Sequence, residues 1–183
     1  MRIIGGKYAG LIVKDPKGFN SRITTDRARE ALFNIINSNF HFDKMVVLDM
    51  FGGAGSITYE FLSRGVKKIV VIEQNIRNFK YILSNVKKLN ELNRVNLIRG
   101  DALKKIKDLR EQADKFDLIF ADPPFDAKFV NKLPDIVFAS DILKDDGWFV
   151  LEHESGKSFE NHSFWFDKRN YGGVMFSFFC KER

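Results

Sequence analysis

The chain has 183 residues, of which 44% are hydrophobic and 19 are phenylalanine, so its composition predicts one packed domain and excludes a disordered polypeptide. It contains no apolar run long enough to cross a bilayer and no N-terminal secretory signal, so we expect no membrane partner. The formal net charge is +6, and residues 1–29 hold seven Lys and Arg against two acids, a local excess of +5. This asymmetry favours a polyanionic partner, and a solvated basic surface is the alternative.

The first 25 residues differ in pattern from the rest of the chain. Two short β-prone runs, Arg2–Ile4 and Leu11–Val13, lie among glycines and predict a small hairpin. We therefore expect residues 1–25 to form a basic β-hairpin extension in front of a domain that spans residues 26–183.

A helix is expected to begin near Thr25 or Asp26, since both residue types are good N-caps. The apolar residues that follow recur with helical spacing, at Ala28, Ala31, Leu32, Ile35 and Ile36. Arg27, Arg29 and Glu30 lie off this apolar stripe and are expected to face outward.

From residue 45 onward, β-prone runs alternate with helical patterns, which predicts an α/β fold with a mostly parallel sheet covered by helices. The first five strands are expected at 45–49, 68–73, 95–99, 116–121 and 148–152. The intervening helices are expected at 56–64, 76–90, 103–112 and 129–138. The last two runs, 163–167 and 174–180, have no helix between them, so residues 168–173 should connect an antiparallel hairpin that completes a seven-stranded sheet.

A glycine-rich loop, Asp49–Gly55, follows the first expected strand. Ligands of open α/β sheets bind beyond the carboxyl ends of the strands, where glycines let a ligand approach the backbone. Glu73 closes the second strand 20 positions after Gly53, and a carboxylate there can accept hydrogen bonds from ribose hydroxyls. Asp101 follows the third strand and is expected near an adenine edge. The pattern therefore predicts an adenosine-bearing ligand.

This pattern does not by itself choose between a nicotinamide dinucleotide and S-adenosylmethionine, and a ligand-free turn is the plain alternative. Thr58 occupies the position of the third glycine in the dinucleotide fingerprint, which weakens the dinucleotide interpretation. The C-terminal hairpin also favours a methyltransferase topology.

A second motif, Asp122-Pro123-Pro124-Phe125, follows the fourth strand. Pro123 and Pro124 lack N–H donors and make a stiff turn. Asp122 and the Pro123 carbonyl would accept both hydrogens of an NH₂ group and orient its lone pair toward a methyl donor, and such positioning contributes about 7–11 kcal/mol in well-oriented systems. Phe125 would stack on the base, a contact of about 1–3 kcal/mol. The alternative is an ordinary Pro-Pro turn with Phe125 in the core.

These motifs resemble class I methyltransferases that modify amino groups, and further strings narrow the resemblance to the RsmD family. Those strings are Arg2–Gly6, Thr24–Ile35, Leu62–Gly65 and Tyr171-Gly172. The family methylates a guanine exocyclic amine in bacterial small-subunit ribosomal RNA. The chain departs from the family pattern at Ile23, at Gly52-Gly53-Ala54 and at Phe125, without loss of a predicted essential group.

The resemblance implies a Rossmann-like class I methyltransferase fold and S-adenosylmethionine as cofactor. Motif and resemblance together assign cofactor binding to Asp49, Phe51, Gly53, Gly55, Glu73 and Asp101. They assign the target base to Asp122, Pro123, Pro124 and Phe125. The RNA is assigned to Lys7, Arg22, Thr24, Arg27 and Arg29, so the expected partner is ribosomal RNA or the small ribosomal subunit.

Two other functions stay open. The Asp-Pro-Pro-Phe motif also suits a DNA adenine or cytosine amino-methyltransferase, but the chain has no evident domain for reading the sequence around a flipped base. The other is a non-catalytic RNA-binding assembly factor, against which Glu73 and Asp122 argue.

The single cysteine, Cys180, cannot form an internal disulfide, which is typical of a reducing cytoplasm. Cys180 and the three histidines show no metal-ligand spacing, so we expect no metal site. A cytoplasmic monomer is the expected state.

Overall fold

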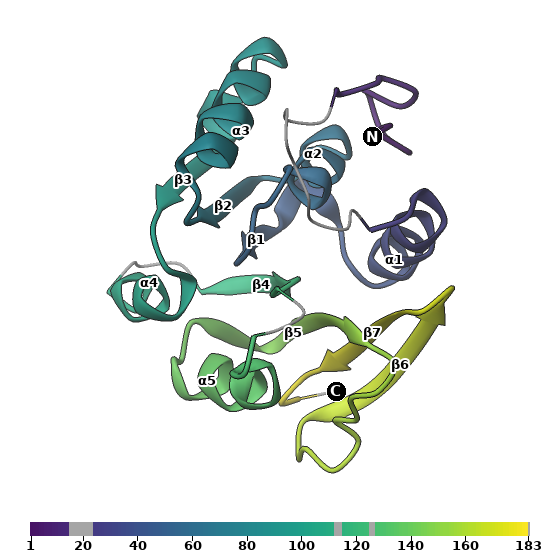
Figure 1. Cartoon of the computed structure of the whole chain (residues 1–183), viewed down its shortest axis with the longest axis vertical. Helices are drawn as coiled ribbons and strands as arrows, with labels where there is room; N and C mark the ends of the chain where they lie inside the picture. Colours follow the sequence, from purple (N-terminus) through teal and green to yellow (C-terminus); the bar gives the residue numbers. More distant parts are fainter. Residues whose placement is uncertain (15–23, 112–114, 125–126, 183) are drawn as a thin grey trace.

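The computed structural model of the chain describes residues 1–14, 24–111, 115–124 and 127–182 (Figure 1). Seven strands in this part of the chain form one sheet in the order β3-β2-β1-β4-β5-β7-β6. The strands are β1 (Val46–Asp49), β2 (Lys68–Glu73), β3 (Val95–Arg99), β4 (Phe116–Ala121), β5 (Leu143–Glu154), β6 (Trp165–Tyr171) and β7 (Val174–Phe179). The first five strands pair in parallel, and β7 pairs antiparallel with both β5 and β6. The expected mostly parallel sheet with an antiparallel C-terminal hairpin is confirmed.

Helices cover both faces of this sheet (Figure 1). The α-helices are α1 (Asp26–Asn39), α2 (Ser56–Ser63), α3 (Ile76–Lys88), α4 (Ala102–Leu109) and α5 (Leu133–Ala139). The short 3₁₀ helices are η1 (Phe42–Lys44), η2 (Leu92–Arg94) and η3 (Val130–Lys132). None of the helices in the described ranges combines the length and the apolar composition that crossing a bilayer requires.

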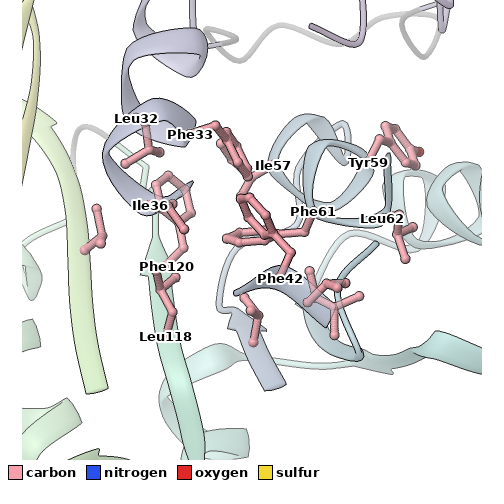
Figure 2. Packing of buried hydrophobic residues seen from close by; sticks show 14 of the residues in the cluster. Leu32, Phe33, Ile36, Phe42, Ile57, Tyr59, Phe61, Leu62, Leu118 and Phe120 are labelled. Atoms are coloured by element: carbon pink, nitrogen blue, oxygen red, sulfur yellow. The ribbon is translucent and has the colours of Figure 1, made fainter. Parts of the chain in front are cut away.

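Two hydrophobic clusters, one on each face of the sheet, form the core. Because successive strand residues point to opposite faces, Val47 of β1 lies in one cluster and its neighbours Val46 and Leu48 lie in the other. On the first face, Leu32 of α1 packs above Phe120 of β4 (Figure 2). With both faces covered, strands β1, β2 and β4 are almost continuously buried, which explains their unbroken apolar runs.

The C-terminal hairpin has a shorter loop than expected. Residues 168–171 belong to β6, so the connection is Gly172-Gly173 alone, with φ of 62° and 88°. Positive φ at both residues is what a two-residue hairpin of the type I′ class requires. The expectation of a six-residue loop was wrong because β6 is an edge strand, and Lys168, Arg169 and Asn170 are polar because they face solvent.

Other bounds also differ from the expectation, most of them by one to three residues. Strand β5 begins at Leu143 rather than at residue 148. The helix expected at 129–138 is divided, since η3 precedes α5 and Pro134 lies in the first turn of α5, a position that proline tolerates well.

The N-terminal hairpin is present, with one antiparallel bridge between Arg2 and Ile12. It packs against the domain, because Ile3 and Val13 are buried in the first core cluster. The division of the chain at residue 25 stays a prediction, since residues 15–23 lie outside the described part.

Ser63, at the end of α2, holds the turn of this hairpin. Its carbonyl accepts a hydrogen bond from the Lys7 N–H at 2.8 Å, and its Oγ accepts one from the Tyr8 N–H at 2.9 Å. Gly6 has a φ of 78°, and a Cβ there would lie 2.0 Å from the Ser63 carbonyl oxygen. This close approach explains why the hairpin turn needs a glycine.

Helix α1 begins as expected, because the Thr25 Oγ1 caps it by accepting from the Ala28 N–H at 3.2 Å. Arg27 and Glu30 are exposed, also as expected. The prediction that Arg29 faces outward was wrong, because its side chain is only 1% exposed. Its guanidinium lies against the buried Glu60 carboxylate of α2, with Nε and Oε1 3.6 Å apart, and this pairing offsets the cost of burying the charge.

Replacing Leu32 by alanine tests the packing of α1 on the sheet. Leu32 is fully buried, so Leu32→Ala should lower the free energy of unfolding by about 2–5 kcal/mol. The matched control Leu92→Ala removes the same atoms from a side chain that is 47% exposed and should change it by at most about 0.5 kcal/mol. Urea unfolding of both variants measures the difference, and equal stabilities would contradict the packing of Figure 2.

Candidate cofactor and substrate cleft

A cleft of about 800 Å³ opens at the carboxyl ends of β1, β2 and β4. The strand order reverses between β1 and β4, and such a reversal is where open α/β sheets bind ligands. Eight of the residues that the sequence singled out line this cleft, namely Thr24, Asp49, Phe51, Gly53, Glu73, Asp101, Asp122 and Pro124. The fold therefore brings the glycine loop and the Asp-Pro-Pro turn to one site.

The glycines of the loop after β1 serve different purposes. A Cβ on Gly52 would lie 2.8 Å from a Val71 methyl group and 2.9 Å from one of Ile82, so a side chain here would require these core residues to move. Gly55 does not line the cleft. It begins α2 with a φ of 82°, and a Cβ there would lie 2.6 Å from the Tyr59 ring. Gly53 lines the cleft directly, with a φ of 54°.

Glu73, at the end of β2, is held from both sides by backbone N–H groups. Its Oε2 accepts from Gly53 at 2.7 Å and its Oε1 accepts from Asn75 at 2.6 Å. Burial raises the pKa of the Glu73 carboxyl, and the hydrogen bonds from Asn75 and Gly53 partly oppose that rise. Each carboxylate oxygen has more than one lone pair, so the fixed group still offers acceptors to the cleft.

Asp49, at the end of β1, is almost completely buried. Burial raises the pKa of its carboxyl to about 6. The Thr58 Oγ1 donates to its Oδ2 at 2.7 Å, which explains a hydroxyl residue where a dinucleotide fold has glycine. Within the described ranges no donor reaches Oδ1 at hydrogen-bonding geometry, although a buried acceptor normally has a partner.

Asp101 both borders the cleft and caps α4. Its Oδ1 accepts from the Leu103 N–H at 2.9 Å and from the Lys104 N–H at 3.2 Å. This capping fixes the side chain beside the cleft.

The Asp-Pro-Pro turn follows β4. Asp122 is half-buried and lines the cleft with Pro124, whereas Pro123 is buried beside it. The Pro124 carbonyl accepts from the Ala127 N–H at 2.9 Å, which closes the turn. Phe125 lies outside the described residues.

Sequence reasoning missed a second aromatic residue of the cleft, Phe129, which it placed in a helix. Its ring stacks with that of Phe51, with centroids 6.2 Å apart and an angle of 15° between the planes. Both rings line the cleft and offer apolar faces to a flat ligand. The available signal was an aromatic residue five positions after Pro124.

The described residues among those assigned to RNA do not form one exposed surface. Thr24 is a buried part of the cleft wall, where its Oγ1 donates to the Glu152 Oε2 at 2.7 Å. Lys7 forms a 2.5 Å ion pair with Glu91, and Arg29 is buried. Arg27 is exposed, and Arg22 lies outside the described residues.

The described residues contain no group of three or more His, Cys, Asp or Glu side chains arranged to hold a metal ion. The glycine loop and the carboxylates of Glu73 and Asp49 fit an organic ligand with hydroxyl groups and a positive charge.

Comparisons with known proteins agree with this geometry. A putative rRNA methyltransferase, YlbH of Bacillus subtilis (strain 168), is 30% identical over 154 residues, which cover 84% of this chain and 83% of the relative. Ribosomal RNA small subunit methyltransferase D of Escherichia coli (strain K12) is 28% identical over 157 residues, which cover 83% and 71%. The solved structure of a putative methylase from Haemophilus influenzae has a TM-score of 0.81 at 25% identity and covers 100% of this chain and 98% of its own. The family described as Conserved hypothetical protein 95 matches residues 1–180, and the chain therefore belongs to this family, the RsmD family of class I, S-adenosylmethionine-dependent methyltransferases.

Proposed function

We propose that this protein transfers a methyl group from S-adenosylmethionine to the exocyclic N2 amine of a guanine in small-subunit (16S) ribosomal RNA. One observation carries the proposal: Asp122 of the Asp-Pro-Pro turn and Glu73 of the cofactor half line the same cleft. The names of the relatives from Bacillus subtilis and Escherichia coli support an rRNA substrate. The protein acts on the ribosomal RNA or small subunit as a cytoplasmic monomer.

The cofactor half of the cleft suits S-adenosylmethionine, which supplies an electrophilic methyl group on a sulfonium. Glu73 accepts the ribose hydroxyls, because its carboxylate is already oriented by Gly53 and Asn75. The Asp49 carboxylate, at the end of β1, supplies negative charge beside a positively charged group of the cofactor, which is favourable in this buried setting. Asp101 and Phe51 border the space for the adenine.

The substrate half suits an exocyclic amine. Asp122 and the carbonyl of Pro123 accept the two N–H hydrogens and so direct the nitrogen lone pair at the methyl group. An amine conjugated to a base is a weak nucleophile, and catalysis then depends on positioning, which contributes about 7–11 kcal/mol in well-oriented systems. Phe125 and Phe129 offer flat faces to the base, and the surplus proton leaves to Asp122 or to water.

The test supplies methyl-labelled S-adenosylmethionine to the purified protein with small subunits from cells that lack this gene, and identifies the labelled nucleoside after digestion. We expect N2-methylguanosine at one site. Asp122→Ala should reduce turnover by at least about 100-fold, because the amine loses its oriented acceptor, while calorimetry shows cofactor affinity within about twofold of the wild type.

Near-normal turnover of Asp122→Ala would contradict the role given to this carboxylate. Methyl label in DNA but not in RNA would contradict the proposal and show that the substrate is an adenine or cytosine of DNA. Cofactor binding without any methyl transfer would contradict the proposal and favour the other function, a non-catalytic RNA-binding assembly factor.

Removal of the Glu73 carboxylate tests the cofactor half. Glu73→Ala should weaken S-adenosylmethionine binding by about 10- to 100-fold, the effect of losing charged hydrogen bonds worth about 1.5–3 kcal/mol. The control Glu30→Ala removes an exposed carboxylate of α1 and should leave the affinity unchanged. Reduced RNA affinity with normal cofactor affinity in Glu73→Ala would mean that the two halves of the cleft are assigned the wrong way round.

The raised pKa of Asp49 predicts pH-dependent cofactor binding. The free carboxyl has a pKa of about 6, so it is protonated below that pH and must lose its proton to receive a cation. Cofactor affinity should therefore fall as the pH drops from 7 to 5, by up to about tenfold per pH unit below the pKa. Asp49→Asn should bind more weakly at pH 8 and should lose this part of the pH dependence.

Glu73 also has a raised pKa, but it titrates in both proteins, so the difference between the two calorimetric pH profiles reports on Asp49. Identical profiles would show that the Asp49 carboxylate does not contact the cofactor's positive charge.

A further inference from the structure

Helix α3 carries four basic residues and no acidic one. At 100° per residue, Arg77, Lys80, Lys87 and Lys88 fall within an arc of about 100°. The buried residues Ile82 and Val86 lie on the opposite side of the helix. The helix therefore presents a basic stripe, defined by these four cations with one pair near each end, and packs against the domain with its other face.

The charges of this stripe are uncompensated. All four side chains are exposed, and in the described part of the chain no acid pairs with them. Arg77 also lies in the first turn of α3, where the helix dipole disfavours a positive charge. Cations that lower the stability of the helix and pair with no acid of the protein are typical of a functional surface.

The N-terminal hairpin is fastened along this helix. The Tyr8 hydroxyl donates to the Leu89 carbonyl at 2.7 Å, just beyond the end of α3. The Tyr81 hydroxyl of α3 donates to the Lys14 carbonyl, and Tyr81 is about 20° from Lys88 around the helix. These bonds bring the exposed Lys14 to the edge of the basic stripe, so hairpin and helix form one surface.

A second observation marks the same surface. The described residues expose four large apolar side chains, and all of them lie on the hairpin or beside an end of α3, at Leu11, Ile12, Ile76 and Leu92. Ile12 is 72% exposed and lies opposite Arg2 in the hairpin bridge. Apolar groups among unpaired cations indicate a surface that a partner covers.

The N-terminal turn of α3, which carries Arg77, borders the cleft, and the residues of this turn that line the cleft are on the other side of the helix from the stripe. Those residues are Asn75 and Asn78, at the start of α3. From Arg77 to Lys88 the helix advances about 16 Å, at 1.5 Å per residue, which is long enough to follow several phosphates of a nucleic-acid strand.

We propose that the basic stripe of α3, continued by Lys14 of the hairpin, binds the phosphate backbone of the RNA substrate beside the cleft. This inference rests on the proposed function and adds a contact surface to it. The partner is RNA rather than an acidic protein or lipid, because the stripe adjoins the cleft in which a base of that RNA is methylated.

The test compares two variants with equal loss of charge. One changes Arg77, Lys80, Lys87 and Lys88 to Gln. The control changes four exposed basic residues away from α3 to Gln, namely Lys44, Lys104, Lys107 and Arg110. The affinity of each protein for small-subunit rRNA is measured across a salt series, alongside its affinity for S-adenosylmethionine.

We expect the α3 variant to bind RNA at least tenfold more weakly at low salt. Its slope of log affinity against log salt should be shallower by about 3, since each lost phosphate contact removes roughly 0.7–0.9 from the slope. The control should keep most of the wild-type slope, and both variants should keep cofactor affinity. A third variant, Arg77→Lys with the three lysines changed to Arg, should bind RNA like the wild type. Phosphate binding here depends on the positive charge and not on which basic side chain carries it.

Equal slopes for the α3 variant and the control would overturn the inference and leave the stripe a solvated surface. Loss of binding to vesicles with anionic lipid, with the RNA slope intact, would overturn it in favour of a membrane surface. Failure of the proposed function has a different result, because the wild-type protein itself would then not methylate the RNA, whatever the salt dependence of its binding.

Discussion

A buried ion pair between Arg29 and Glu60 determines how the N-terminal hairpin, α1 and α2 fit together. Both side chains are 1% exposed, and such charges are tolerated only when they are paired and hydrogen-bonded. The Glu60 carboxylate accepts the Ile4 N–H at 2.6 Å. The Arg29 guanidinium donates to the carbonyls of Thr24 at 3.1 Å and Arg2 at 2.7 Å. One pair of charges therefore holds two segments in place, the hairpin around Arg2 and Ile4 and the residue before α1, Thr24.

The two ends of this network have different functions in the proposal. Thr24 belongs to the cleft wall, where it bonds to Glu152, whereas Arg2 lies in the hairpin beside the exposed Ile12. Methyl transfer requires a base to be placed to within fractions of an ångström of the methyl group, and positioning groups must themselves be held rigidly. The buried pair links the hairpin to the cleft wall and provides this rigidity. This role explains why Arg29, one of the basic residues near the N-terminus, is buried.

The sequence predicted best where local pattern and burial agree. Strands β2, β3 and β4 have the expected bounds, because short β-prone runs between polar turns have few alternatives. The sequence placed Gly53 and Glu73 at one site, but the hydrogen bond between them was not predicted. Burial of Arg29 could not be predicted, because its partner Glu60 is distant in the chain and helical spacing alone places Arg29 outside the apolar stripe. The stripe on α3 was not predicted either, because its four cations are spread over twelve positions and only the helix brings them to one side.

The charges of the cleft and of its surroundings explain why a basic surface outside the cleft is needed at all. Four carboxyl groups line the cleft, those of Asp49, Glu73, Asp101 and Asp122, and no lysine or arginine of the described residues does. Such a lining suits a cationic cofactor and an amine, but it repels phosphate. The nucleic-acid backbone must therefore be held beside the cleft while only an uncharged base enters it. Cations that extend from the cleft mouth along α3 satisfy that requirement, whereas cations inside the cleft would compete with the cofactor for its carboxylates.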